Sequence, residues 1–188
     1  VQKVMANMQI SGSVSGMHGV FKDMNDAINA SIEAQKKVCT MTLDQREQII
    51  SLIRKKTHEN AEILANMGVN ETGMGNVGDK ILKHHLTADK VPGTEDISTI
   101  AWSGDRGLTL VEMGPFGVIG AITPATNPSE TVICNCIGML AGGNTVVFNP
   151  HPNAKKTTIY TINMINEASI EAGGPDNIAV TVEAPTLD

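Results

Sequence analysis

Short apolar runs and amphipathic segments alternate along the second half of the sequence. Residues 116–122 and 144–148 are runs of apolar and β-branched side chains, which are typical of strands buried in a parallel sheet. Between them, residues 131–140 carry apolar side chains at helical spacing, and two glycines end this segment. A strand, a helix and a strand within roughly 35 residues predict a βαβ unit with parallel strands.

The alternation continues beyond this unit. Residues 155–172 place isoleucines on one side of a predicted helix, which a Gly-Gly-Pro sequence ends. Residues 178–182 form a third run rich in β-branched side chains. The order β-α-β-α-β over residues 116–182 predicts an α/β fold, namely the first half of a doubly wound parallel sheet.

The first half of the sequence predicts helices followed by one hairpin. Asp23 or Asn25 can cap the first helix, and a Thr-Leu-Asp-Gln capping box opens the second. Four helices are predicted within residues 23–88. They cover residues 23–38, a segment that begins at the capping box of residues 42–45, residues 58–68, and residues 77–88. Strand-like segments at 99–102 and 108–113 flank a Gly-rich turn, which predicts a projecting hairpin over 97–113 outside the parallel sheet.

The N-terminal segment has a pattern of its own. Val1, Val4, Met5 and Met8 share one face of a helix, and residues 11–16 form a linker of small residues. One interpretation is a helix that docks on its own domain. Because the linker separates it from the remaining chain, a recognition helix on a flexible tether is favoured.

Composition narrows the class of protein. A net charge of −6 without a basic stripe argues against a nucleic-acid partner. No apolar run approaches the ~20 residues that span a bilayer, and the three cysteines, an odd number, fit a reducing compartment. A cytoplasmic protein without a membrane or nucleic-acid partner is therefore predicted.

The ends of the chain predict a fragment. The chain begins at Val1 without an initiator Met and stops at Asp188, soon after the third predicted strand. We therefore divide it into a helix with linker at 1–16 and a partial nucleotide-binding domain at 17–188. The alternative is a non-catalytic nucleotide-binding or assembly module. Such a module should cover its third strand, whereas an exposed apolar face there favours a fragment.

Several segments together resemble one enzyme family. They are Glu-Thr-Gly-Met-Gly at 71–75, Pro-Ala-Thr-Asn-Pro at 124–128, Ala-Gly-Gly-Asn-Thr-Val-Val-Phe at 141–148 and Asn-Pro-His-Pro at 149–152. The sequence resembles the aldehyde dehydrogenase superfamily, and within it the CoA-acylating branch found in bacterial microcompartments.

The resemblance implies a function for the parent protein. Members of this branch oxidise short aliphatic aldehydes such as propanal or acetaldehyde to acyl-CoA, with NAD as cofactor and coenzyme A as co-substrate. In the family, the hairpin pairs between subunits, which implies a homo-oligomer. An N-terminal helix targets these enzymes to the microcompartment shell or lumen, so residues 1–8 are expected to contact a shell protein.

Candidate cofactor-binding residues follow the three predicted strands, because ligands of open α/β sheets bind outside the carboxyl ends of the strands. They are Thr123, Pro124 and Ala125; Asn149, Pro150 and His151; and Ala184 and Pro185. The resemblance implies that the first group borders nicotinamide and ribose, and that the last two residues line the adenine pocket.

Two positions in these loops depart from a simple dinucleotide site. Asn149 stands where most aldehyde dehydrogenases have a Lys on the adenosine ribose, and the missing cation should weaken NAD retention. His151 could contact a phosphate or CoA, or it could cap a surface turn. No GxGxxG sequence occurs, so ordinary Rossmann phosphate binding is not supported.

Asn127 is the candidate catalytic residue, as a side-chain amide donor to the oxyanion. The superfamily usually has Pro-Trp-Asn-Phe-Pro at this turn, whereas this chain has Pro-Ala-Thr-Asn-Pro, with Asn one place later. Thr126 is therefore an alternative donor. Asn127 could instead serve only as the helix N-cap.

No candidate nucleophile or metal site emerges from the sequence. Cys39 falls near a helix end, and Cys134 and Cys136 are two apart on a helix and so point to different faces. All three are expected to be structural, so the catalytic Cys of the family would lie beyond this chain. His84 and His85 are adjacent on a predicted helix and are both expected at the surface.

Overall fold

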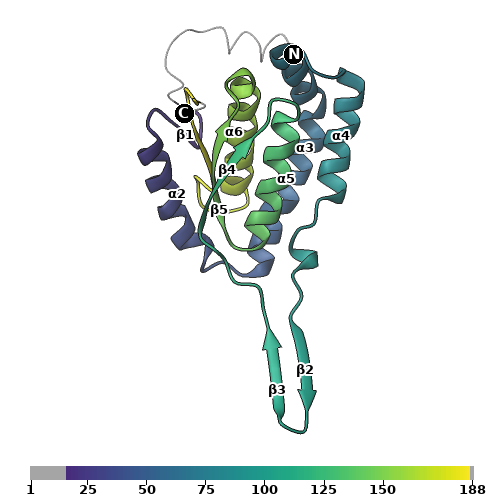
Figure 1. The fold of residues 1–188 in the computed structure, drawn as a ribbon, viewed down its shortest axis with the longest axis vertical. Coiled ribbons are helices and arrows are strands. Elements are labelled where there is room, and N and C mark those ends of the chain that lie inside the picture. Colours follow the sequence, from purple (N-terminus) through teal and green to yellow (C-terminus); the bar gives the residue numbers. More distant parts are fainter. Residues whose placement is uncertain (1–15, 187–188) are drawn as a thin grey trace.

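The computed structural model describes residues 16–186, which form a four-stranded parallel sheet with helices on both faces and a separate hairpin (Figure 1). The sheet strands are β1 (Val20–Phe21), β4 (Val118–Thr123), β5 (Thr145–Pro150) and β6 (Ala179–Val182), in the order β1-β6-β5-β4. The predicted α/β class is confirmed. The sequence did not reveal β1, because two residues are too short to form a recognisable pattern.

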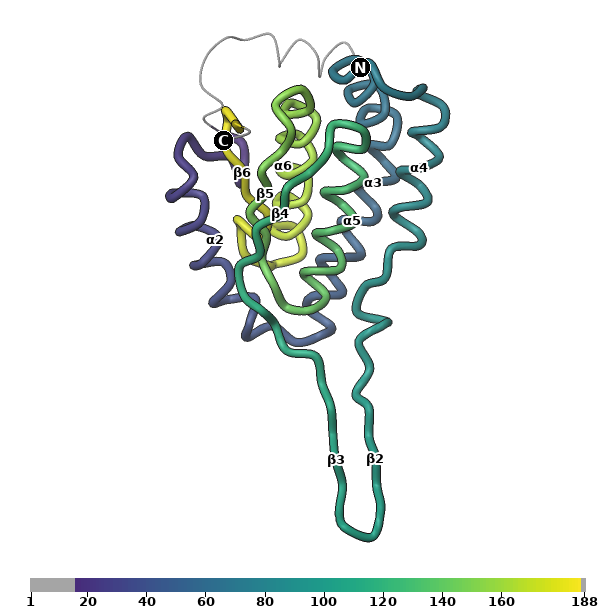
Figure 2. Tube along the Cα trace, viewed as in Figure 1, coloured from purple at the N-terminus to yellow at the C-terminus, as the bar shows by residue number. Residues whose placement is uncertain are grey.

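Helices cover the two faces of the sheet unequally, as the chain trace shows (Figure 2). The helices are α2 (Met24–Val38), α3 (Leu43–Thr72), α4 (Val77–Lys90), α5 (Pro128–Ala141) and α6 (Lys155–Glu171). On one face, Ala27 of α2 packs against Val147 and Val180. The neighbouring strand residues Val146 and Phe148 point the other way, into a larger core that α3, α5 and α6 complete.

The helix α3 corrects one prediction. The sequence predicted one helix opened at 42–45 and another over 58–68, but a single helix runs from Leu43 to Thr72. The predicted capping box begins it, and Gly73 ends it in the left-handed conformation. No Gly or Pro lies between the two predicted helices, and the buried Thr57 hydroxyl donates to Ile53 O within the helix.

The hairpin of β2 (Ile100–Gly104) and β3 (Gly107–Val111) extends away from the sheet (Figure 1). All of its strand residues are exposed, including apolar ones such as Trp102 and Leu108. Two short 3₁₀ helices, η1 (Thr94–Asp96) and η2 (Pro152–Ala154), complete the described elements.

The third predicted strand, β6, is covered. All four of its residues are buried, and it lies between β1 and β5. Within the parallel sheet, the large apolar residue that is exposed is instead Ile122 of the edge strand β4, at 87% of its full accessibility. The burial of the third strand therefore does not favour a fragment over a module.

The predicted N-terminal helix and most of its linker lie outside the described residues, which begin at 16. Within residues 16–186, no helix combines the length and apolarity that crossing a bilayer requires.

Candidate functional site at the carboxyl edge of the sheet

The loops after β4 and β5 meet at the carboxyl edge of the sheet, as predicted for parallel strands. Thr123 and Pro150 are register partners, and the backbone N–H of His151 donates to Thr123 O over 3.1 Å. Asn149 Nδ2 donates to the carbonyl of Thr186 over 3.2 Å, which ties β5 to the loop after β6. That loop also contains the predicted adenine-pocket residues, Ala184, which is exposed, and Pro185, which is buried.

Two polar side chains at this edge, Thr123 and His151, differ in their surroundings. Thr123 is 2% exposed, and its Oγ1 has no hydrogen-bond partner within residues 16–186. His151 Nδ1 accepts from the Asn153 backbone N–H over 3.1 Å, so a neutral ring carries its proton on Nε2. The ring caps η2, as one of its two interpretations required, and still presents an N–H donor. The His151 N–H is compatible with a contact to a ribose or phosphate oxygen, whereas the Thr123 hydroxyl is enclosed by the protein.

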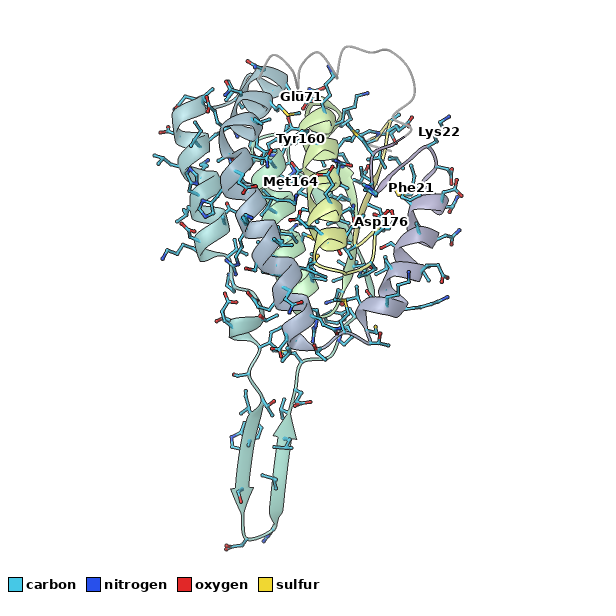
Figure 3. All side chains as sticks on the ribbon, turned by 180° about the vertical axis from the view of Figure 1, so that it is seen from behind. Phe21, Lys22, Glu71, Tyr160, Met164 and Asp176 are labelled. Carbon is cyan, nitrogen blue, oxygen red and sulfur yellow. The ribbon has the colours of Figure 1, made fainter. Side chains whose placement is uncertain are left out.

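The N-terminus of α6 is occupied by a side chain from elsewhere in the fold. The carboxylate of Glu71 accepts from the backbone N–H groups of Lys156 and Thr157, each over 2.8 Å, and from Thr157 Oγ1 over 2.7 Å. Glu71 thus lies beside the start of α6 (Figure 3). Because a carboxylate already satisfies these amides, this helix end is not an open phosphate site. The absence of GxGxxG agrees with this arrangement.

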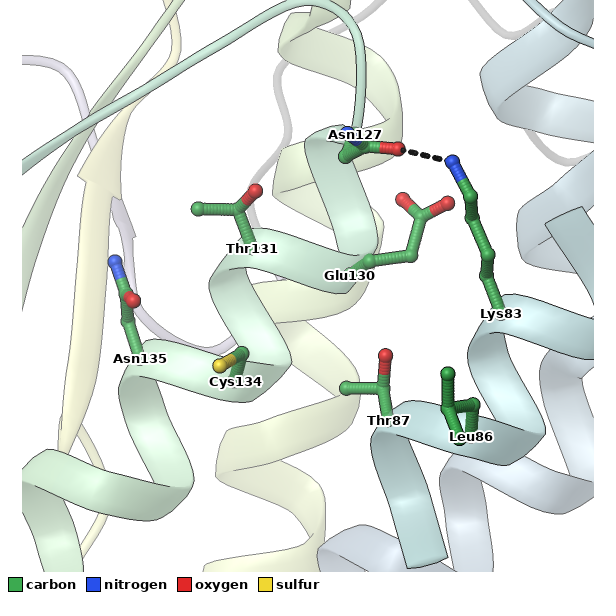
Figure 4. A pocket seen from close by; sticks show the side chains of 8 residues that line it. All are labelled: Lys83, Leu86, Thr87, Asn127, Glu130, Thr131, Cys134 and Asn135. Carbon is green, nitrogen blue, oxygen red and sulfur yellow. Dashed lines mark hydrogen bonds between the residues drawn. The ribbon is translucent and has the colours of Figure 1, made fainter. Parts of the chain in front are cut away.

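Asn127 stands at the N-cap position of α5 without capping it. Its side chain makes no hydrogen bond to the first turn of the helix, although its carbonyl accepts from Thr131 N over 3.1 Å. Instead, Asn127 Oδ1 accepts from Lys83 Nζ of α4 over 3.2 Å (Figure 4). The alternative that Asn127 serves only as a side-chain cap therefore does not describe this turn.

Thr126, the alternative donor, is held through its main chain. Its side chain is exposed, and its carbonyl accepts from Lys80 Nζ over 2.9 Å. Lys80 is 3% exposed, and its ammonium also lies 3.3 Å from Glu130 Oε1 in the first turn of α5. A buried ion pair thus fixes the main chain immediately before Asn127.

His84 corrects a second prediction, because it is completely buried rather than at the surface. Its Nδ1 donates to Lys80 O over 2.6 Å, and its Nε2 lies 2.7 Å from Ser129 Oγ. Burial lowers the pKa of His84, and the charge of Glu130 opposes this only in part. A neutral ring then accepts a hydrogen bond from the Ser129 hydroxyl. Glu130 Oε2, at a longer distance of 3.2 Å from Ser129 Oγ, is an alternative acceptor for the same hydroxyl.

We refer to Lys80, His84, Ser129 and Glu130 as the buried polar cluster. Its members connect α4 to the first turn of α5, directly behind the Thr126–Asn127 turn. None of the four was predicted from the sequence to be buried. Within α4, the signal was a spacing of four residues, since Lys80, His84 and Ala88 share one face. Because a Lys and a His occupy that face, the sequence does not mark it as a buried face.

An open pocket of about 300 Å³ lies beside the turn, between α4 and α5 (Figure 4). It is lined by Lys83, Leu86 and Thr87 of α4, by Asn127, and by Glu130, Thr131, Cys134 and Asn135 of α5. Its lining combines methyl and methylene groups with a few polar atoms, and it therefore suits a small molecule with one polar end.

The three cysteines occupy different environments. Cys136 is buried in the core, and burial raises its pKa to about 12. Cys134 is exposed and lines the pocket, but partial burial raises its pKa as well. A raised pKa is the wrong direction for a thiolate nucleophile. Cys39 is exposed at the C-terminal end of α2. Within residues 16–186, no group of three His, Cys, Asp or Glu side chains could hold a metal ion.

Residues 9–185 match the profile of the aldehyde dehydrogenase family. Over 178 residues the chain is 49% identical to an acetylating acetaldehyde dehydrogenase of Bilophila wadsworthia, covering 95% of this chain and 36% of that protein.

Solved structures agree with this match. The propionaldehyde dehydrogenase from the Clostridium phytofermentans fucose utilisation bacterial microcompartment is 73% identical, with a TM-score of 0.89, over 91% of this chain and 39% of that one. The propionaldehyde dehydrogenase of Rhodopseudomonas palustris, solved with bound CoA and an acylated cysteine, is 47% identical, with a TM-score of 0.87, over 90% and 39%. The chain therefore spans well under half the length of these relatives.

Proposed function

Because the chain belongs to the aldehyde dehydrogenase family, we propose that the whole protein is a CoA-acylating aldehyde dehydrogenase. Its reaction converts a short aliphatic aldehyde, CoA and NAD⁺ into acyl-CoA, NADH and a proton. The aldehyde carbon loses a hydride, and the acyl group passes to the sulfur of CoA. The names of the relatives, which act on acetaldehyde or propionaldehyde, support this substrate class, and the CoA bound to one of them supports the acceptor.

The observation that carries the proposal is the orientation of Asn127. Its Oδ1 faces Lys83, so the Nδ2 group faces away from the ammonium and can donate to a ligand. A donor held in place before the reaction stabilises the negative charge that develops on the aldehyde oxygen when a nucleophile attacks its carbon. We assign this oxyanion role to Asn127 rather than Thr126, whose carbonyl is what the buried polar cluster holds.

The aldehyde chain is assigned to the pocket between α4 and α5. Asn127 lines this pocket, so an aldehyde oxygen at its amide leaves the carbon chain directed along Thr131 and Leu86. The small volume of the pocket and its mixed polar and apolar lining suit aldehydes with two or three carbon atoms.

NAD and CoA are assigned to the carboxyl edge of the sheet. Thr123, Pro124 and Ala125 are suited to hold the nicotinamide and ribose, and Asn149, Pro150 and His151 the adenosine and phosphates, with Ala184 and Pro185 lining the adenine site. NAD supplies the hydride acceptor when bound. No lysine occupies position 149, and this supports weak retention of NAD and its exchange with CoA in one cleft.

The nucleophile is assigned to a part of the protein beyond this chain. Cys136 is buried with a pKa of about 12, and partial burial raises the pKa of Cys134, so neither thiol favours the thiolate. The 188-residue chain alone is therefore expected to be inactive. CoA-dependent NAD reduction by this chain, with its mass verified, would contradict that expectation.

Assembly and location follow from the same proposal. The exposed apolar residues of the hairpin, such as Trp102 and Leu110, are suited to pair with another subunit in a homo-oligomer. Sedimentation of the whole protein checks this. The microcompartment origin of one relative supports a location inside a bacterial microcompartment, with residues 1–8 contacting a shell protein. Deleting these residues should then release the enzyme from isolated microcompartments.

The decisive assay measures NADH production by the whole protein from propanal, with and without CoA. We expect production to depend on CoA. Asn127→Ala should lower kcat by about 10²- to 10³-fold, because one oxyanion donor is lost, while the KM for CoA changes little. Thr126→Val is the matched control and should remain close to wild type. Full activity of Asn127→Ala together with a large loss in Thr126→Val would transfer the donor role to Thr126.

One observation favours the second candidate, a non-catalytic nucleotide-binding or assembly module. The third strand of the βαβαβ unit, β6, is covered on both sides, as a module requires, although the edge strand β4 leaves Ile122 exposed. The assay separates the two functions. A whole protein that binds NAD or CoA in titration but never forms NADH supports the module.

A further inference from the structure

We propose that Lys83 is a positioning residue that sets the orientation of the Asn127 amide. This inference rests on the proposed function, in which Asn127 is the oxyanion donor. The Lys83 ammonium lies 3.2 Å from Asn127 Oδ1. An ammonium group has three donors and no acceptor, so only the oxygen end of the amide can face it. Figure 4 shows this oxygen directed at Lys83 and the nitrogen on the opposite side of the amide.

Without Lys83, the Asn127 side chain has a competing partner. Asn at an N-cap position ordinarily turns its oxygen back onto the backbone N–H groups of the first helical turn. Asn127 occupies that position, yet it makes no such hydrogen bond. Lys83 therefore holds the oxygen away from the helix end. The typical strength of an N-cap hydrogen bond corresponds to about a fivefold change in conformer population, which sets the scale of the expected effect.

Two lysines of α4 contact different parts of this turn. Lys80 and Lys83 are three residues apart and so lie on neighbouring parts of the helix surface. The buried Lys80 donates to the main chain at Thr126 O, whereas the exposed Lys83 donates to the side chain of Asn127. A substitution at position 83 can therefore change the amide orientation while the buried polar cluster remains intact.

The proposal makes Lys83 act through Asn127 rather than on the substrate, and a double-mutant cycle tests this directly. In the whole protein, Lys83→Met should lower kcat for propanal oxidation about five- to tenfold, with the KM for CoA and NAD unchanged. Lys83→Arg, which keeps a cationic donor, should recover most of the loss. Lys83→Met in the Asn127→Ala background should cause no additional loss.

Lys90→Met is the matched control, because Lys90 is also exposed on α4 and no contact links it to the turn. Its kcat should equal that of the wild type. A wild-type kcat in Lys83→Met, or an equal loss in the presence and absence of Asn127, overturns the positioning role.

A structural readout separates failure of this inference from failure of the proposed function. In a crystal structure of the whole protein with Lys83→Met, Asn127 Oδ1 should have turned to the first-turn N–H groups of α5. An unchanged amide overturns the inference even if the enzyme is active. If wild-type protein forms no NADH with CoA, the proposed function fails, and a turned amide would then show only that Lys83 orients Asn127.

Discussion

The carboxyl edge of the sheet has two halves that are stabilised by different interactions. Beside α4 and α5, the turn that carries Asn127 is held by a buried ion pair, a buried imidazole and a lysine ammonium. Beside β5 and β6, the loops are held by main-chain register and by single hydrogen bonds of Asn149 and His151.

The difference matches the tasks that we assign to the two halves. An oxyanion donor must be fixed before charge develops. If it had to reorient during the reaction, the free energy of that reorientation would offset the stabilisation that the donor provides. Charged groups in a low-dielectric environment hold geometry strongly, although burying them has a large desolvation cost. A cleft that admits NAD and CoA in turn has no need of such rigidity, and small residues with few polar atoms suffice there.

Lys80→Met is the strongest way to break the catalytic half. The substitution leaves the buried Glu130 carboxylate without its cation, so the chain should lose about 3–5 kcal/mol of unfolding free energy. Urea unfolding of the 188-residue chain measures this. Lys83→Met, at an exposed position, is the control and should stay within about 0.5 kcal/mol of wild type.

A second variant tests the cause. Lys80→Met with Glu130→Leu replaces the pair by apolar side chains and should recover most of the lost stability. Equal instability of the single and double variants would show that the ion pair is not the reason for the loss.

His84 makes the catalytic half sensitive to pH. The pKa of His84 is lowered in the folded state. Below about pH 6.5, the unperturbed value, the unfolded chain therefore binds a proton at this residue that the folded chain does not bind. Stability is therefore full above this pH and falls as the pH drops towards the folded-state pKa, by at most about 1.4 kcal/mol per pH unit from this group.

The matched variant is His84→Gln, which keeps polar atoms but does not titrate. Urea unfolding at pH 7.5 and at pH 5.5, both chosen within roughly one unit of the unperturbed His pKa, should show a smaller difference in the variant than in the wild type. Identical pH dependence in the two chains would mean that the pKa of His84 is the same in the folded and the unfolded chain.

Asn149→Lys tests the cofactor half. The lysine restores a cation beside the proposed ribose site and should tighten NAD binding about tenfold, close to the ~1.5 kcal/mol of one charge-assisted hydrogen bond. Titration of the whole protein with NADH measures the Kd. Binding as weak as in wild type would show that position 149 does not contact the cofactor. A matching rise in the KM for CoA would support exchange in a shared cleft.

Local sequence patterns determined most of the fold. Apolar runs, helical spacing and glycine stops gave the βαβαβ order, and the four-residue capping box located the start of α3. The motif residues after each strand were brought to one edge because parallel strands end on the same side. These features depend on neighbours within a few residues, which a sequence displays directly.

Tertiary structure alone decided the remaining features. His84 and Lys80 are polar residues on a helix, and they are buried because Ser129 and Glu130, 45 and 50 residues away, supply their partners. The orientation of the Asn127 amide depends on Lys83, 44 residues away. A polar side chain gains the partners that make its burial tolerable only when distant segments pack together, and no local pattern records which segments will do so.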